Sequence, residues 1–95
     1  MKGLILKWAS ERGLLVKGNE RNQLIKLMEE VGELSSAILK DNQPEVKDAL
    51  GDIQVVLIIL CYQLGYDLDE CLEDAYNVIK NRTGKMDNGT FVKDK

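Results

Sequence analysis

The chain has 95 residues, with 16 acidic and 13 basic side chains and no histidine, so its formal net charge is −3. This length allows one small domain, and a hydrophobic content of 44% excludes wholesale disorder. The absence of histidine excludes Ser-His or Cys-His nucleophile pairs and histidine-containing zinc or di-iron sites. Any chemistry must therefore depend on carboxylates, amines, hydroxyls or a bound metal.

Apolar residues recur at helical spacing along most of the chain, which contains a single proline. The predicted helices cover residues 4–12, 20–40, 44–64 and about 67–82. Pro44 suits the first turn of the third helix, and Gly65 is expected to end it. The pair Asn88-Gly89 is typical of a type I′ turn and predicts a short hairpin near the C-terminus. We therefore expect an all-α chain, a small four-helix bundle over residues 1–83, with a tail or β-hairpin over 84–95.

Two apolar features predict the core. On the second helix, the residues with i, i+3, i+4, i+7 spacing are Leu24, Leu27, Met28, Val31, Leu34 and Ile38. The third helix is apolar on every side from Val55 to Cys61, which predicts burial all round. Four short helices have difficulty covering such a helix, so we expect self-association as a homodimer or homotetramer.

Cysteine usage and charge placement limit the class of protein further. Cys61 is expected to be a core thiol and Cys71 a free thiol on a helix, which fits a reducing cytoplasm. No stretch reaches the ~18 apolar residues that span a bilayer, so no membrane association is expected. Residues 27–74 carry two basic and twelve acidic groups, a balance of −10, between two basic ends. A nucleic-acid binder would show a dominant basic surface, and this chain does not.

The first acidic cluster is Glu29, Glu30 and Glu33 on the second helix. Glu30 falls about 100° from the centre of the apolar face, at the edge of the buried arc. Glu33 follows one turn later, so the carboxylates of Glu30 and Glu33 can converge on one point. Glu29 points furthest from the apolar face.

The second acidic cluster is Glu45, Asp48 and Asp52, on a stripe of the third helix that continues into the apolar core residues. Buried carboxylates are paired, protonated or bound to a metal, and this stripe holds no Lys or Arg. If the two helices pack antiparallel, four carboxylates favour a hard cation such as Mg²⁺ or Mn²⁺. The alternative is that these acids are solvated, which we favour for Glu45 because it follows Pro44 in a first helical turn.

The segment from Leu27 to Leu34, Leu-Met-Glu-Glu-Val-Gly-Glu-Leu, resembles the Glu-Glu-x-x-Glu-Leu motif of the MazG-like all-α nucleoside triphosphate pyrophosphohydrolases. Residues 48–53, Asp-Ala-Leu-Gly-Asp-Ile, resemble the second motif of that family. The segment Trp-Ala-Ser-Glu-Arg-Gly at residues 8–13 is similar to the opening of many members. The resemblance covers roughly residues 4–83.

The resemblance implies a Mg²⁺-dependent enzyme that cleaves a nucleoside triphosphate to the monophosphate and pyrophosphate. It assigns metal binding to Glu30 and Glu33 of the first motif and to Asp52 of the second. The family commonly has Glu three residues before that Asp, where this chain has Ala49. Asp48 can supply the missing oxygen, because it lies i, i+4 from Asp52.

With no histidine present, Glu29 or Glu33 is the candidate to orient or deprotonate the attacking water. The family often has a Lys where this chain has Val78, so phosphate contacts fall to basic and polar residues near the end of the fourth helix. The candidate substrate-binding residues are Trp8, Asn22, Gln23, Lys26, Asn77, Lys80 and Arg82, with Lys85 a further basic neighbour. The alternatives are a core position for Trp8 and a solvated basic helix end for Lys80 and Arg82.

Two other functions stay open. A non-enzymatic helical module would keep the fold and use its surface for oligomerisation or partner binding, and Ala49 and Val78 favour it. A divalent-metal sensor or storage bundle is the second, although the basic ends of the chain favour a phosphate-bearing ligand.

Overall fold

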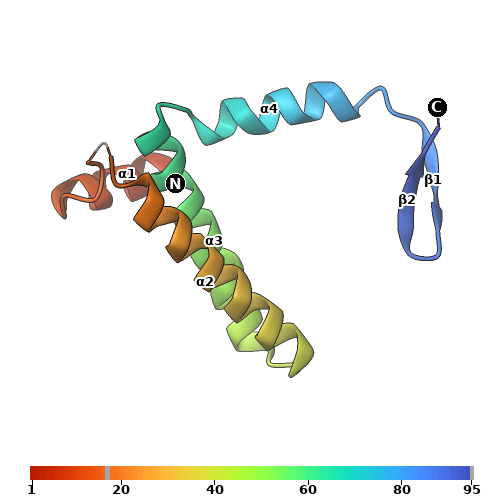
Figure 1. Ribbon diagram of the computed structural model, residues 1–95, viewed down its shortest axis with the longest axis horizontal. Helices are drawn as coiled ribbons and strands as arrows, with labels where there is room; N and C mark the ends of the chain where they lie inside the picture. The colour runs from red at the N-terminus through yellow and green to blue at the C-terminus, as the bar shows by residue number, and fades with distance from the viewer. Residues whose placement is uncertain (17, 95) are drawn as a thin grey trace.

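A computed structural model describes residues 1–16 and 18–94, which form four α-helices and a C-terminal hairpin, as predicted (Figure 1). The helices are α1 (Lys2–Glu11), α2 (Glu20–Leu39), α3 (Gln43–Leu64) and α4 (Leu68–Ile79). The strands are β1 (Gly84–Asp87) and β2 (Thr90–Lys93). Helices α2 and α3 form an antiparallel helical pair, α1 packs on α3, and α4 leaves the end of α3 at 98°. No single described helix is long and apolar enough to cross a membrane, but α3 and α4 taken together meet that criterion.

Local sequence signals explain where the helices begin and end. The Asn42 side chain accepts a hydrogen bond from the Glu45 backbone N–H at 3.3 Å, and Pro44 lies in the first turn of α3. Gly65 ends α3 in the left-handed conformation, with φ of 84°. Asp67 caps α4 by accepting from the Glu70 backbone N–H at 3.1 Å. Helix α4 ends at Ile79, three residues before the predicted end, where the basic segment begins.

The predicted core face of α2 is wrong in most of its members. Leu27 and Leu34 are half-buried, whereas four of the six are exposed: Leu24, Met28, Val31 and Ile38. The face that meets α3 is rotated toward Glu30 and Ala37, the two buried residues of α2. Apolar residues occupy a wide arc of α2, and its small alanine lies on the side that packs against α3.

Helix α3 is not buried all round within one chain. Its buried residues are Ala49, Val56, Ile59 and Gln63, which follow one side of the helix. Between Val55 and Cys61 the other side chains are half-buried, Cys61 among them. The Gln63 side chain donates to the Leu14 carbonyl at 2.8 Å and so ties the segment after α1 to α3. The expectation of complete burial therefore fails in a single copy of the chain.

The arm (residues 68–93) consists of α4 and the hairpin and contains no buried residue. Its first turn is anchored by Lys2 of α1, whose Nζ pairs with Asp67 and, at 2.8 Å, with Asp69. Asn88 and Gly89 have φ of 50° and 79°, which confirms the predicted type I′ turn. Within the described residues, the two strands pair with each other and pack against no helix. The arm thus extends away from the helical pair (Figure 1).

Candidate functional site

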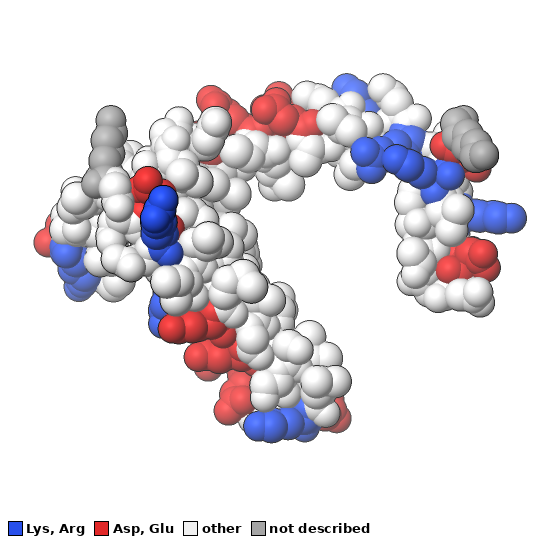
Figure 2. All heavy atoms as spheres, in the orientation of Figure 1, with Lys and Arg blue, Asp and Glu red and all other residues white. Residues whose placement is uncertain are grey.

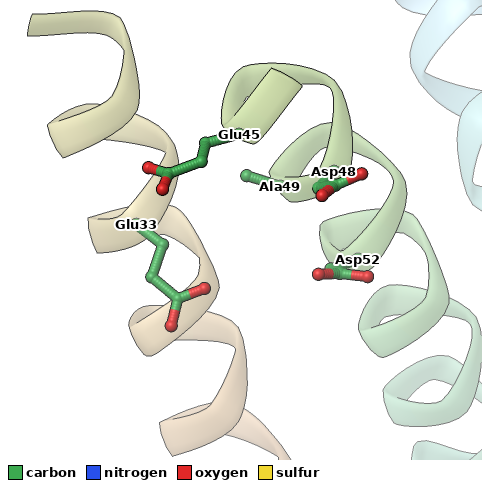
Figure 3. Close-up of a pocket in the computed structure, with 5 residues that line it drawn as sticks. All are labelled: Glu33, Glu45, Asp48, Ala49 and Asp52. Atoms are coloured by element: carbon green, nitrogen blue, oxygen red, sulfur yellow. The ribbon is translucent and has the colours of Figure 1, made fainter. Parts of the chain in front are cut away.

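A pocket of about 360 Å³ lies between α2 and α3, near the end of the helical pair that is remote from α4. Glu33 of α2 faces it, together with Glu45, Asp48, Ala49 and Asp52 of α3 (Figure 3). Four of the five lining residues are acids, and all four acids are exposed to solvent. We call this the acidic pocket.

The spacing along α3 explains why the acids line the pocket. Asp52 lies eleven residues before Gln63, three helical turns away, so both point to nearly the same side of α3. Gln63 is buried there, whereas Asp52 is exposed, because the side facing α2 opens into the pocket at this end. Asp48 precedes Asp52 by about one turn and lies above it (Figure 3). Three acids of the two sequence motifs, Glu33, Asp48 and Asp52, therefore line one pocket.

Ala49 occupies the wall of the pocket where the resemblance leads us to expect a glutamate. Its methyl group is buried and points toward α2 between the acids (Figure 3). Glu45, one turn earlier, extends from the start of α3 toward α2 above Glu33. As expected for a first-turn acid, Glu45 is exposed to solvent, but it also lines the pocket, although the motifs do not place it among the metal ligands. Its i, i+3, i+7 spacing with Asp48 and Asp52 is the signal that places it at the pocket.

Glu30 is the only buried acid among the described residues, at 5% exposure. Its Oε1 lies 3.2 Å from Lys26 Nζ, while its Oε2 is buried with no hydrogen-bond partner. The pair raises the pKa of Lys26 above its ordinary value, through the hydrogen bond and charge of Glu30. A buried carboxylate oxygen without a donor is costly, so this position favours a further cationic ligand.

The acids act on one another electrostatically. The negative charge of Glu30, one turn earlier, raises the pKa of Glu33 above its ordinary value. Partial desolvation and the charge of Asp52 add to this shift, and the charge of Lys26 opposes it. Like charges this close disfavour the ionised state of Glu33 unless a cation lies between them.

The donor set fits a hard divalent cation, although the side chains do not yet enclose one. In the described part of the chain, no three acidic or thiol groups stand together in a ready-made cage. The unpartnered oxygen of Glu30 and the raised pKa of Glu33 nevertheless mark an excess of negative charge. Carboxylate oxygens of this kind are the ligands that Mg²⁺ and Mn²⁺ take.

Several predicted site residues do not line the acidic pocket. Glu29 is exposed, with its Oε2 3.8 Å from Lys26 Nζ. Trp8 lies in a separate apolar hollow with Val55 of α3, under the Arg12 guanidinium, 4.4 Å from the ring centroid. On α2, Gln23 is half-buried, and Asn22 donates to Asn19 Oδ1 at 2.8 Å.

The predicted phosphate-binding residues Asn77, Lys80 and Arg82 lie at the far end of α4 and just beyond it. The arm carries them away from the acidic pocket of their own chain (Figure 1). No packing between α4 and α2 occurs among the residues that the structure describes. Of the basic residues predicted for substrate binding, Lys26 is the one that contacts a motif acid of its own chain.

Fold and pocket together define an all-α protein with a carboxylate-lined site between two antiparallel helices. The model of the MazG-like family matches residues 24–91, a segment that contains every acid of the pocket. The chain therefore belongs to the MazG-like family.

The chain is also 44% identical over 59 residues to an uncharacterized 18.2 kDa protein in the rep-hol intergenic region of Haemophilus phage HP1 (strain HP1c1). That match covers 62% of this chain and 36% of the phage protein, so the chain spans well under half of that relative. No solved structure matches the chain.

Proposed function

We propose that the chain is a Mg²⁺-dependent nucleoside triphosphate pyrophosphohydrolase that releases nucleoside monophosphate and pyrophosphate. The observation that carries this proposal is the acidic pocket, with the buried and unpartnered Glu30 oxygen beside it. Membership of the MazG-like family supports the same reaction class. In this reaction one water is consumed as the anhydride bond between the α- and β-phosphates breaks.

The metal ligands that we propose are Glu30, Glu33, Asp48 and Asp52, with Mn²⁺ as a possible substitute for Mg²⁺. Glu45 is a further candidate, because it extends into the space in front of Ala49 where the usual glutamate is missing. When bound, the cation neutralises polyphosphate charge and lowers the pKa of a coordinated water. Substitution distinguishes Asp48 from Glu45 as the fourth metal ligand. If Asp48→Asn loses metal affinity and Glu45→Gln does not, Asp48 is that ligand.

The side chains of the chain supply the remaining chemistry. Glu33 lines the pocket and its pKa is raised, so it is a better acceptor for a water proton than an ordinary surface glutamate. Glu29 remains a second candidate base, although it lies outside the pocket. Lys26 holds Glu30 in place through its ion pair and adds positive charge toward a phosphate.

The other substrate contacts depend on assembly. Because Asn77, Lys80 and Arg82 stand on the arm, any contact they make with a nucleotide in an acidic pocket is made in the pocket of a neighbouring copy. We therefore propose a homodimer or homotetramer as the active form, with Trp8, Asn22 and Gln23 as further nucleotide contacts. Two free thiols, Cys61 and Cys71, support a reducing, cytoplasmic setting.

The test is a panel of NTPs and dNTPs incubated with the protein and Mg²⁺ or Mn²⁺, with pyrophosphate as the readout. We expect release from at least one nucleotide, its loss on chelation, and a strong reduction in Asp52→Asn. Asp74→Asn is the matched control, since Asp74 is an exposed helical aspartate on the arm. Activity that survives chelation would contradict the role of the cation.

The alternative is a non-enzymatic module that uses the same fold for oligomerisation or partner binding. The unpartnered apolar surface of the arm and the Ala49 replacement favour it. Failure of every nucleotide in the panel to release pyrophosphate would favour this alternative over the enzyme.

A further inference from the structure

The corner between α3 and α4 holds both cysteines of the chain. Cys61 lies four residues before Gly65, where α3 ends. Cys71 lies three residues after Leu68, where α4 begins. At 1.5 Å of rise per residue, each cysteine is about 4–6 Å from the corner, one on either side of it. Because the two helices meet at 98°, side chains at these positions come close where both lie toward the facing sides of the helices (Figure 1).

Both cysteines follow a residue that lies on the facing side of its helix. Ile58 of α3 and Leu68 of α4 line one hollow, which lies between the two helices and α1. Cys61 comes three residues after Ile58, and Cys71 comes three residues after Leu68. Residues at i and i+3 are neighbours on one face of a helix. The two thiols therefore flank the same side of the corner.

The acids of α4 leave this side of the helix free. They are Asp69, Glu70, Glu73 and Asp74. Figure 2 shows acidic side chains along the outer edge of α4, while uncharged side chains line the inner side of the bend. At 100° per residue, Cys71 lies about 130° round the helix from the centre of the acidic face. A row of carboxylates would repel a thiolate, so this position leaves Cys71 open to attack on a disulfide.

The two thiols differ in burial and act on each other electrostatically. Cys61 is half-buried, whereas Cys71 is exposed. Burial raises the pKa of the Cys61 thiol above its ordinary value, and the charge of Cys71 adds to the shift. The corner thus combines an accessible thiol with a protected thiol beside it, which is the arrangement of an attacking and a resolving cysteine.

The direction of the arm depends on few contacts. No residue of α4 is buried, and Lys2 holds its first turn through the ion pairs with Asp67 and Asp69. At the turn itself, the Tyr66 backbone N–H donates to the Cys61 carbonyl at 2.8 Å. A covalent bond across the corner would add a link that neither pH nor salt weakens.

We propose that Cys61 and Cys71 form a reversible intrachain disulfide that fixes the angle between α3 and α4. The oxidant is a low-molecular-weight disulfide, such as glutathione disulfide, whose own bond is reduced in the exchange. The bond concerns the corner and not the acidic pocket, so the proposal does not depend on nucleotide cleavage.

The exposed thiol reacts first. The Cys71 thiolate attacks one sulfur of the small disulfide, a bond forms between these two sulfurs, and the other half leaves as a thiolate that takes up a proton. Cys61 then gives up its proton and attacks the Cys71 sulfur of the mixed disulfide, which releases the second half as a thiol. Two protein thiols are oxidised, and one small disulfide is reduced to two thiols.

The first test measures disulfide formation in the full, reduced chain. The chain is incubated with glutathione disulfide, quenched with acid, alkylated under denaturing conditions and weighed by intact-mass spectrometry. We expect a product that has lost two hydrogens, carries no alkyl group and runs as a single chain on non-reducing denaturing electrophoresis. Thiols that stay open to alkylation in a large excess of glutathione disulfide, a chain that carries two glutathiones, or an interchain disulfide as the main product would each overturn the proposal.

Serine variants distinguish the attacking thiol from the resolving one. Cys61→Ser is expected to stop at a mixed disulfide between Cys71 and one glutathione. Cys71→Ser is expected to react about tenfold more slowly or less, because the remaining thiol is half-buried and its pKa is raised. Equal rates in the two variants would overturn the assignment of Cys71 as the attacking thiol.

Hydrogen exchange tests the effect of the bond on the corner. In the wild type, the disulfide is expected to slow amide exchange in the first turn of α4 by about tenfold and to leave Ile59 unchanged. Cys71→Ser under the same treatment is the matched control, because it cannot form the bond and is expected to show no slowing. A disulfide-bonded chain whose α4 exchanges as fast as in the reduced chain would overturn the role of the bond in fixing the corner.

Discussion

The helical pair and the arm use their apolar residues in opposite ways. In the pair, Ile59 and Val56 are buried and α2 lies along α3 for most of its length. In the arm, a strongly amphipathic helix and a two-stranded hairpin are formed by local signals alone and bury nothing. Caps and turns can therefore specify where an element begins and ends without supplying the burial that stabilises it.

The same contrast separates the charges. The pair concentrates acids of both motifs at one pocket, while the basic residues Lys80, Arg82 and Lys85 lie at and beyond the end of α4. A nucleoside triphosphate needs both kinds of charge, cation-binding carboxylates and direct phosphate contacts. Within one chain, the pocket acids and these basic residues lie far apart. Direct phosphate contacts from the basic residues to a nucleotide in the pocket therefore require the proposed association of two copies.

The largest expected effect is on the stability of the pair. Ile59 is 2% exposed, so Ile59→Ala is expected to lower the free energy of unfolding by about 2–5 kcal/mol. Ile79→Ala removes the same atoms from an exposed position on the arm. Its effect is expected to depend on protein concentration, because it weakens association rather than the fold of one chain.

Denaturant unfolding at two protein concentrations, monitored by circular dichroism, separates the two effects. Equal losses for both variants at every concentration would mean that the arm is already packed within its own chain.

The next largest effect is on activity, and it is expected for a substitution in the helical pair but not for the same substitution in the arm. Glu30→Gln keeps the shape of the buried side chain but removes its charge, so pyrophosphate release is expected to fall by roughly 100-fold. Glu73→Gln, the same substitution on the exposed face of α4, is expected to leave release unchanged. If both variants retain wild-type rates, Glu30 does not hold the cation, and the ligand set must be sought among the exposed acids of the pocket alone.

Mg²⁺ should stabilise the fold through the acidic pocket, which the arm does not line. At tenfold above its dissociation constant, a bound cation stabilises the fold by about 1.4 kcal/mol. We expect Mg²⁺ to raise the melting temperature of the wild type and to have little effect on Glu33→Gln. Without Mg²⁺, Glu33→Gln should melt at a higher temperature than the wild type at neutral pH, because it relieves the repulsion from Glu30 and Asp52. A wild-type melting temperature that Mg²⁺ leaves unchanged would argue against the metal site.

The sequence predicts correctly those features that depend on a few neighbouring residues. It does not predict which side of a helix is buried when the same apolar pattern is compatible with two packings. Caps and glycines located the helices, and Asn88-Gly89 located the hairpin, because each acts within a few residues. The apolar arc of α2 holds two stripes, and periodicity alone does not tell which one meets α3. The structure shows that Ala37 of α2 and Ala49 of α3 are buried, so the small side chains lie on the packed sides of the two helices, and that is a property of the packed pair.

The same distinction applies to the acidic pocket. Motif spacing was enough to expect Glu33, Asp48 and Asp52 near one another, since antiparallel packing brings the two motifs to one level. Glu45 was assigned to solvent, because a first-turn acid is ordinarily explained by the helix dipole. Glu45 is exposed as expected, but it also lines the pocket between α2 and α3, which only the packed helices reveal.

The smallest expected effect is at the junction that orients the arm. Lys2 pairs with Asp67 and Asp69, and the pairing raises the pKa of Lys2 to about 12 and lowers that of Asp67. Because the lysine pKa is raised on folding, its stabilising contribution is complete below pH 10.5 and disappears as the pH rises through about 12. The contribution from Asp67 is present above the ordinary aspartate pKa and is lost on acidification through its lowered value.

At a pH where Lys2 and Asp67 are both charged, Lys2→Met should therefore speed amide hydrogen exchange at the first turn of α4. Exchange at Ile59 of the helical pair should stay unchanged. Faster exchange throughout α3 as well would show that the junction supports the pair, and that arm and pair are less independent than their burial implies.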